Sequence, residues 1–189
     1  MSSHFDGQAA AGYLDGPPRQ VPGYWGLLRM TTMLLAERLQ AEGRVLVVGA
    51  GGGLEIRAMA ESHAGWSFHG VDPSAPMLAL AGTTLQAHAS RVTLQQGYVA
   101  DAPDGPFDGA TCILVLHFVP REQRLATLQA VRRRLRPGAP FVLAHISFPQ
   151  TEPERSDWIA RHVAFGMPDG TPAAQMESAR HAIATWLSV

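Results

Sequence analysis

The feature that most constrains this chain is a run of glycines placed directly after a short apolar stretch. The apolar residues Val45 to Val48 lead into Gly49-Ala-Gly-Gly-Gly53, and a helix-type sequence follows. Glycine lets the backbone approach a ligand closely, and the helix behind such a turn presents unpaired N–H groups to that ligand. A plain strand-to-helix turn needs only one or two glycines, so the run predicts a loop that binds a nucleotide-like ligand. A dinucleotide loop starting at Gly49 would require glycine at position 54, where this chain has Leu54.

Apolar β-type runs alternate with helical ones around this loop. Strands that are almost continuously apolar and separated by helices form parallel sheets that are covered on both faces. The pattern therefore predicts an α/β fold with a doubly wound, mostly parallel sheet of about five strands. The expected strands are residues 45–48, 66–71, 91–95, 110–113 and 141–146.

Three segments are expected along the chain. Residues 1–20 are rich in Gly, Ala and Pro and predict a flexible lead or lid, residues 21–148 form the α/β core, and residues 149–189 form a helical tail. The tail has no convincing β run, so the strand at 141–146 is expected to lie at an open sheet edge. Because open edges are usually covered, we expect the tail helices or a second copy of the chain to mask it, the latter as a homodimer. Because no further pair of strands follows residues 141–146, a truncated form of a longer enzyme is a further expectation.

A carboxylate follows the second expected strand, about 20 residues after the glycine loop. The strand ends in Gly70-Val-Asp72-Pro-Ser74. An aspartate at the tip of the strand beside a glycine loop can accept both hydroxyls of a ribose. Capping of the next helix is the alternative role for Asp72, but Ser74 is better placed for it.

Composition removes several classes of function. All fifteen basic residues are arginine, and the absence of lysine excludes Schiff-base and P-loop lysine chemistry. A net charge of -1 without a long basic run disfavours nucleic acid as a partner and favours a small molecule. The single cysteine, Cys112, lies in an apolar stretch, which indicates neither a disulfide framework nor a metal site and fits the cytoplasm. No apolar run is long enough to predict a membrane span or a secretion signal.

The G-x-G-x-G spacing of residues 49–53 resembles motif I of the class I S-adenosylmethionine-dependent methyltransferases. Residues 96–99, 107–108, 116–118 and 135–138 look like the same family in order and spacing. The resemblance implies the Rossmann-like methyltransferase fold, S-adenosyl-L-methionine as cofactor, and methyl transfer to a small-molecule acceptor.

Site residues follow from this resemblance. It implies that the cofactor is bound by Tyr24, Gly49, Ala50, Gly51, Gly53, Asp72, Pro73, Met77, Tyr98, Val99 and Ile113. Pro73 and Met77 would border the adenine, and Tyr13 and Tyr24 would close over the cofactor as a lid. The family usually has Gly-Asp where this chain has Gly97-Tyr98, so the backbone at Tyr98 and Val99, or Asp101, is expected to hold the adenine amino group.

Residues 21–24 and 142–148 are similar to carboxy-S-adenosylmethionine synthase, a family that adds a carboxylate to the cofactor for tRNA modification. That family grips the added carboxylate with an arginine beyond the fifth strand, but residues 164–170 contain none here, and Arg161 is the remaining candidate. Since an unpaired carboxylate in a closed pocket is costly, ordinary methyl transfer is the first prediction. A carboxy-S-adenosylmethionine synthase-like enzyme and a catalytically silent S-adenosylmethionine-binding module are the alternatives.

Two histidines are candidates for a general base, because His117 and His145 both follow strand ends where α/β sheets place ligands. A lone histidine is more often packed or solvated, and methyl transfer often needs only positioning. A run of arginines at 132–134 and 136 is expected to be the solvated face of a helix rather than a surface for RNA.

Overall fold

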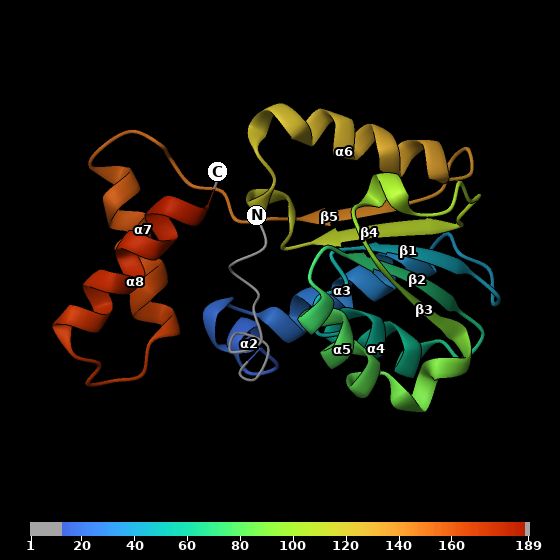
Figure 1. The fold of residues 1–189 in the computed structure, drawn as a ribbon, viewed down its shortest axis with the longest axis horizontal. Coiled ribbons are helices and arrows are strands. Elements are labelled where there is room, and N and C mark those ends of the chain that lie inside the picture. The colour runs from blue at the N-terminus through green and yellow to red at the C-terminus, as the bar shows by residue number, and fades with distance from the viewer. Residues whose placement is uncertain (1–12, 188–189) are drawn as a thin grey trace.

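A computed structural model describes residues 13–187 of the 189-residue chain, so the expectations for residues 1–12 lie outside the described part. Within it, five strands form one parallel sheet in the order β3-β2-β1-β4-β5 (Figure 1). The strands are β1 Arg44–Val48, β2 Ser67–Asp72, β3 Val92–Gln96, β4 Gly109–Ile113 and β5 Phe141–Ala144. This order, which reverses direction at β1, confirms the predicted doubly wound α/β fold.

Helices cover both faces of the sheet (Figure 1). One face carries α3 Tyr24–Ala36, α4 Leu54–Ser62 and α5 Ala75–Thr84, and the other carries α6 Arg121–Arg134. Short helices connect them: α2 Gly16–Gln20, η1 Gln86–Arg91, η2 Val99–Asp101 and η3 Leu116–Phe118. Side chains along β1 point alternately to the two faces of the sheet. Val45 and Val47 pack in the hydrophobic cluster that includes α4, and Leu46 and Val48 pack in the cluster that includes α6. No helix within residues 13–187 is long and apolar enough to cross a bilayer.

The tail forms two helices, α7 Glu154–Gly166 and α8 Ala173–Trp186, that lie apart from the sheet (Figure 1). They pack against each other and, through α7, against α2, where Gly166 lies beside Gln20. The edge of β5 is not masked by them: Leu143 is 39% exposed, and a hollow of about 410 Å³ runs between β5 and the end of α3. The tail helices therefore do not cover this edge. Coverage by a second copy of the chain stays a prediction.

One arginine departs from the predicted solvated face of α6. Arg134 is buried, and its guanidinium donates hydrogen bonds to the carbonyl oxygens of Ala100, Ala102 and Ala130 at 2.7–3.0 Å. The expectation was therefore wrong for Arg134, because the last turn of α6 ends against η2, whose carbonyl groups need donors. Arg136 is held differently, by a 2.5 Å ion pair with Asp108. Arg134 thus fixes the turn that follows β3.

Candidate functional site

The glycine loop turns sharply over the carboxyl end of β1. Gly49, Gly51 and Gly53 have φ angles of +75°, +50° and +85°, a left-handed conformation that glycine adopts without steric cost. The loop is tied to the neighbouring strand, because the N–H groups of Gly49 and Ala50 both donate to Val71 O, at 2.8 and 3.0 Å. The sequence thus folds here into a tight cradle in front of the N-terminus of α4.

Asp72 lies at the tip of β2, beside this cradle. Its Oδ2 accepts from Gly51 N at 2.9 Å, and its Oδ1 accepts from Ser74 N at 2.9 Å. Burial raises the pKa of Asp72, and these two N–H groups oppose the rise. Ser74 Oγ accepts from Met77 N at 3.3 Å and so caps α5, the role that the sequence assigned to it. Each carboxylate oxygen keeps a second lone pair, which leaves Asp72 able to accept hydroxyls of a ligand.

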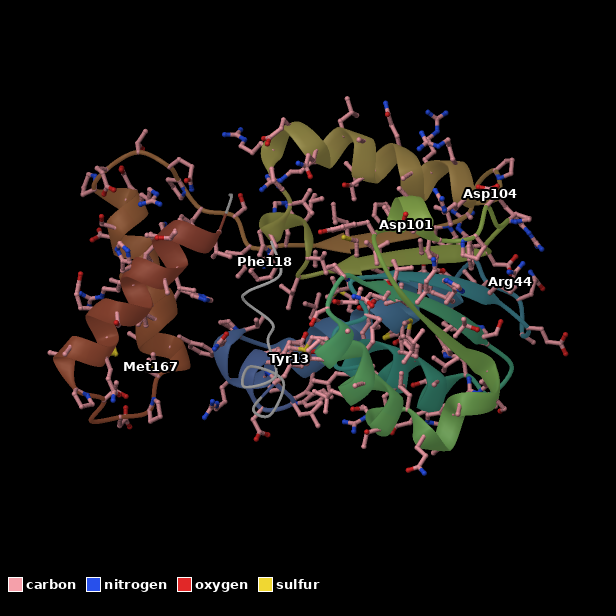
Figure 2. The ribbon with its side chains drawn as sticks, in the orientation of Figure 1. Tyr13, Arg44, Asp101, Asp104, Phe118 and Met167 are labelled. Carbon is pink, nitrogen blue, oxygen red and sulfur yellow. The ribbon has the colours of Figure 1, made fainter. Side chains whose placement is uncertain are left out.

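Two tyrosines lie at the glycine loop. A methyl group built at Gly51 would be 2.6 Å from Tyr13 Oη, and one built at Gly52 would be 2.7 Å from Tyr13 Cδ1, so the Tyr13 ring lies directly on the loop. Figure 2 shows Tyr13 and Phe118 on the side where the strands end, with Arg44 on the opposite side. Burial, and then the charges of Asp72 and Glu55, raise the pKa of Tyr13 to about 12. Tyr24, in α3, is buried, and burial followed by Tyr13 raises its pKa.

Glu55 is a buried acid beside the glycine loop that sequence reasoning did not single out. It occupies the first turn of α4, immediately behind the glycine loop, and only 7% of it is exposed. Burial raises the pKa of Glu55 to about 7, while the neighbouring Thr111 hydroxyl favours the charged form. Even so, neither Glu55 Oε1 nor Thr111 Oγ1 has a partner with hydrogen-bond geometry. An acid in a first helical turn suits the helix dipole at a surface, so the sequence alone gave no signal of its burial.

The residues expected around adenine lie on α5 and η2 or just before them. Met77 and Val99 are buried, whereas Pro73 is exposed and Tyr98 is 55% exposed. Asp101 Oδ2 accepts from Tyr98 N at 2.8 Å, so this carboxylate closes the η2 turn. Pro73 and Tyr98 are therefore the positions of this set that present accessible surface to a ring, whereas Met77 and Val99 are closed off by packing.

The carboxyl end of β4 faces the glycine loop. Ile113 is buried there, and Leu114 has φ +60°, a left-handed conformation that is uncommon for a residue with a side chain. Leu114 N donates to Ala144 O at 2.7 Å, which carries the sheet pairing one residue past β4. Val115 then touches Gly49, where any side chain on the loop would collide with it. Neither Leu114 nor Val115 was expected from the sequence, because their roles depend on the turn after β4.

The two candidate histidines differ in their surroundings. His117 is buried, and burial, followed by the charges of His145, Arg124 and His162, lowers its pKa to about 4. Its Nδ1 accepts from Ile146 N at 3.1 Å, which leaves the ring proton of the neutral form on Nε2. A neutral ring with this tautomer offers a donor rather than a free basic nitrogen. His145 is exposed, with Nδ1 at 2.9 Å from Ile146 O.

Comparison with known proteins gives the family. The family described as "Methyltransferase domain" matches residues 45–138. Carboxy-S-adenosyl-L-methionine synthase of Aeromonas salmonicida is 28% identical over 184 residues, covering 95% of this chain and 74% of that protein. The synthase of Citrifermentans bemidjiense is 28% identical over 187 residues, covering 95% and 75%. This chain thus spans about three quarters of the length of these relatives.

Solved structures agree with this result. A S-adenosylmethionine-dependent methyltransferase from Geobacter sulfurreducens, in complex with S-adenosyl-L-homocysteine, has a TM-score of 0.55 and 25% identity, covering 74% of this chain and 54% of that one. Phosphoethanolamine N-methyltransferase 2 of Haemonchus contortus, with S-adenosyl-L-methionine, shares the fold at a TM-score of 0.55 and 19% identity, covering 81% and 36%. A parallel sheet with a glycine cradle and an acid on the next strand defines a Rossmann-like binding domain. The chain belongs to the class I S-adenosylmethionine-dependent methyltransferases, and its cofactor is S-adenosylmethionine.

Proposed function

We propose that this protein binds S-adenosylmethionine across the glycine loop and transfers its methyl group to a small-molecule acceptor. The observation that carries the proposal is the position of Asp72, whose carboxylate lies between Gly51 N–H and Ser74 N–H at the ends of two adjacent strands. A carboxylate held there is suited to the ribose hydroxyls, and the glycine cradle is suited to the amino-acid end of the cofactor.

The reaction asks for positioning more than for a base. The acceptor attacks the methyl carbon, the bond from that carbon to sulfur breaks, and the sulfur keeps the electron pair, leaving S-adenosylhomocysteine. An acceptor that carries a proton on the attacking atom loses it to solvent or to a nearby base. Because the sulfonium is already a good leaving group, orientation and exclusion of water supply most of the acceleration. The engaged Nδ1 of His117 supports a scheme in which this histidine acts as a packed donor.

The acceptor class is inferred from charge. The chain carries 15 basic and 16 acidic residues. In the run of arginines at the end of α6, Arg134 donates its hydrogen bonds to backbone carbonyl groups. Such a surface offers little to a polyanion, which favours a small acceptor. The test is incubation of the protein with methyl-labelled S-adenosylmethionine and either fractionated metabolites or total RNA. Formation of S-adenosylhomocysteine with a labelled small molecule supports the proposal, whereas labelling of RNA alone, or of nothing, contradicts it.

A carboxy-S-adenosylmethionine synthase-like activity is the second candidate, because curated relatives carry that name. Against it, Arg161 lies on α7, pairs with Asp157 of the same helix at 3.8 Å and covers the ring of Trp158. An arginine held in this way is not poised for an added carboxylate at the glycine loop. Mass spectrometry of the ligand retained on purified protein tests this candidate: the carboxymethyl sulfonium supports the synthase, whereas the methyl sulfonium together with a labelled acceptor in the assay above supports methyl transfer.

A further inference from the structure

The Glu55 carboxyl is the buried polar group that the site described so far leaves unused. Its Oε1 is inaccessible to solvent and has no hydrogen-bond partner, and the neighbouring Thr111 Oγ1 is in the same condition. Among residues 13–187, no ion pair includes Glu55. Native proteins pair nearly all buried carboxyl groups, because an unpaired one loses its solvation without compensation. These two adjacent oxygens therefore mark a place with unused capacity to accept hydrogen bonds.

The position of Glu55 relates this unused acceptor capacity to the glycine loop. Glu55 follows Gly53 by two residues in the first turn of α4, and its neighbour Thr111 belongs to β4. Asp72 ends β2, and β1 separates β2 from β4 in the sheet. Since neighbouring strands lie about 4.8 Å apart, β2 and β4 are roughly 10 Å apart on either side of β1. A ligand whose ribose is held by Asp72 reaches the region of Glu55 with its other end.

The groups around Glu55 indicate which chemical group this end of the ligand carries. Tyr13 from the lead and Tyr24 from α3 are close enough for Glu55 to raise the pKa of both, as is Cys112 from β4. Arg57, on α4, pairs with Glu61 at 3.8 Å, and its charge lowers the pKa of Tyr24, against the larger effect of burial. Among residues 13–187, the groups around Glu55 are thus neutral hydroxyls and a thiol, and no ion pair includes its carboxyl. A site of this kind favours a cationic hydrogen-bond donor.

We propose that the Glu55 carboxylate binds the α-ammonium group in the amino-acid moiety of S-adenosylmethionine, with Thr111 Oγ as a second acceptor beside it. The inference rests on the proposed function and adds the residue that anchors the methionine end. Glu55 acts here as a positioning residue: it holds the ligand on the side of β4 while Asp72 holds the ribose on the side of β2.

Binding is then coupled to a proton. Because burial raises the pKa of Glu55 to about 7, part of the protein carries a neutral Glu55 at neutral pH, and an incoming ammonium favours the charged form. Ligand binding at pH 7 therefore releases a proton from Glu55, and affinity rises between pH 6 and pH 8. The pKa values of Tyr13 and Cys112 lie at about 12, far above this window. Asp72 also has a raised pKa, so comparison of variants at Glu55 is needed to assign the effect.

Calorimetric titration of three ligands tests the proposal on the whole chain. S-adenosylmethionine has the ammonium and the sulfonium, S-adenosylhomocysteine has only the ammonium, and 5′-methylthioadenosine has neither. Glu55→Gln should weaken the first two ligands by about 10- to 100-fold, the value of one charge-assisted hydrogen bond, and leave the third unchanged. Titration in two buffers of different ionisation enthalpy should show proton release in the wild type and none in Glu55→Gln. Glu61→Gln, on the same helix and exposed, is the matched control and should change nothing.

Each result has a definite meaning. Equal affinities of wild type and Glu55→Gln for S-adenosylhomocysteine overturn the proposal, as does a loss for S-adenosylmethionine alone, which would place the sulfonium at Glu55. Equal weakening of all three ligands overturns it as well, because it would show an effect of Glu55 that does not depend on the ammonium group. If the wild type binds none of the three ligands, the proposed function fails, and the failure is distinguishable because no variant is then involved.

Discussion

Burial of the Glu55 carboxyl without a partner lowers the unfolding free energy of the ligand-free protein. Replacing Glu55 by glutamine measures how much is lost. The pKa of this carboxyl rises from 4.5 to about 7 on folding, mainly because burial disfavours the charged form. Between these values the unfolded chain has released its proton while the folded chain still holds it. Folding therefore takes up a proton, and stability falls as pH increases through this window and levels off above pH 7.

The size of the effect follows from the same values. A pKa that rises from 4.5 to about 7 corresponds to about 3 kcal/mol of unfolding free energy, to order of magnitude. Glutamine has nearly the same shape as protonated glutamate and does not ionise. The variant should thus match the wild type near pH 4.5 and exceed its stability by about 3 kcal/mol at pH 8.

Urea unfolding of both proteins at intervals from pH 4.5 to pH 8 measures this difference. Taking the difference between the two proteins removes the contribution of other titrating groups. Glu61→Gln serves as control, since Glu61 is an exposed residue whose replacement should give a difference that is flat with pH. A difference for Glu55→Gln that is equally flat would refute the reasoning, because it would mean that Glu55 ionises in the folded protein as it does in water.

Three further predictions concern other parts of the molecule. The pKa of His117 falls from 6.5 to about 4 on folding, so stability should drop by about 3 kcal/mol, to order of magnitude, as pH decreases through this window, and His117→Gln should remove much of that drop in urea unfolding. If Tyr13 lies on the glycine loop as a lid, hydrogen exchange of residues 5–25 should change when S-adenosylhomocysteine is added, and identical exchange would contradict the lid. If a second copy covers β5, light scattering should find a dimer that Leu143→Lys disrupts, whereas a monomeric wild type would contradict it.

Local patterns predicted the fold and one side of the site. The glycine run and the acid at the next strand tip are short-range signals, and both imply the backbone geometry found at Gly51 and Asp72. Strand positions followed from apolar runs, with ends misplaced by a residue or two, as at β5, where the expected strand continued to Ile146 but ends at Ala144.

What the sequence did not predict depends on contacts between distant segments. Glu55 and Arg134 both stand in helical turns where a charged residue is ordinarily solvated, and each is buried by an element far away in the chain. For Arg134 that element is η2, whose carbonyl oxygens attract the guanidinium. For Glu55 it is β4, which places Thr111 beside the carboxyl. Burial of a charge is a tertiary property, so periodicity within one helix does not reveal it.

The measurement that tests the account most directly is calorimetric titration of S-adenosylmethionine into the wild type, Asp72→Ala and the control Asp104→Ala. Asp104 is an exposed acid outside the glycine loop, and Figure 2 shows it far from Tyr13. Asp72→Ala should keep the fold and lose about 2 to 4 kcal/mol of binding free energy, because two charge-assisted hydrogen bonds to the ribose are removed. The wild type and Asp104→Ala should bind the cofactor equally. Unchanged affinity in Asp72→Ala, or no binding by the wild type, would contradict the assignment of this loop as the cofactor site.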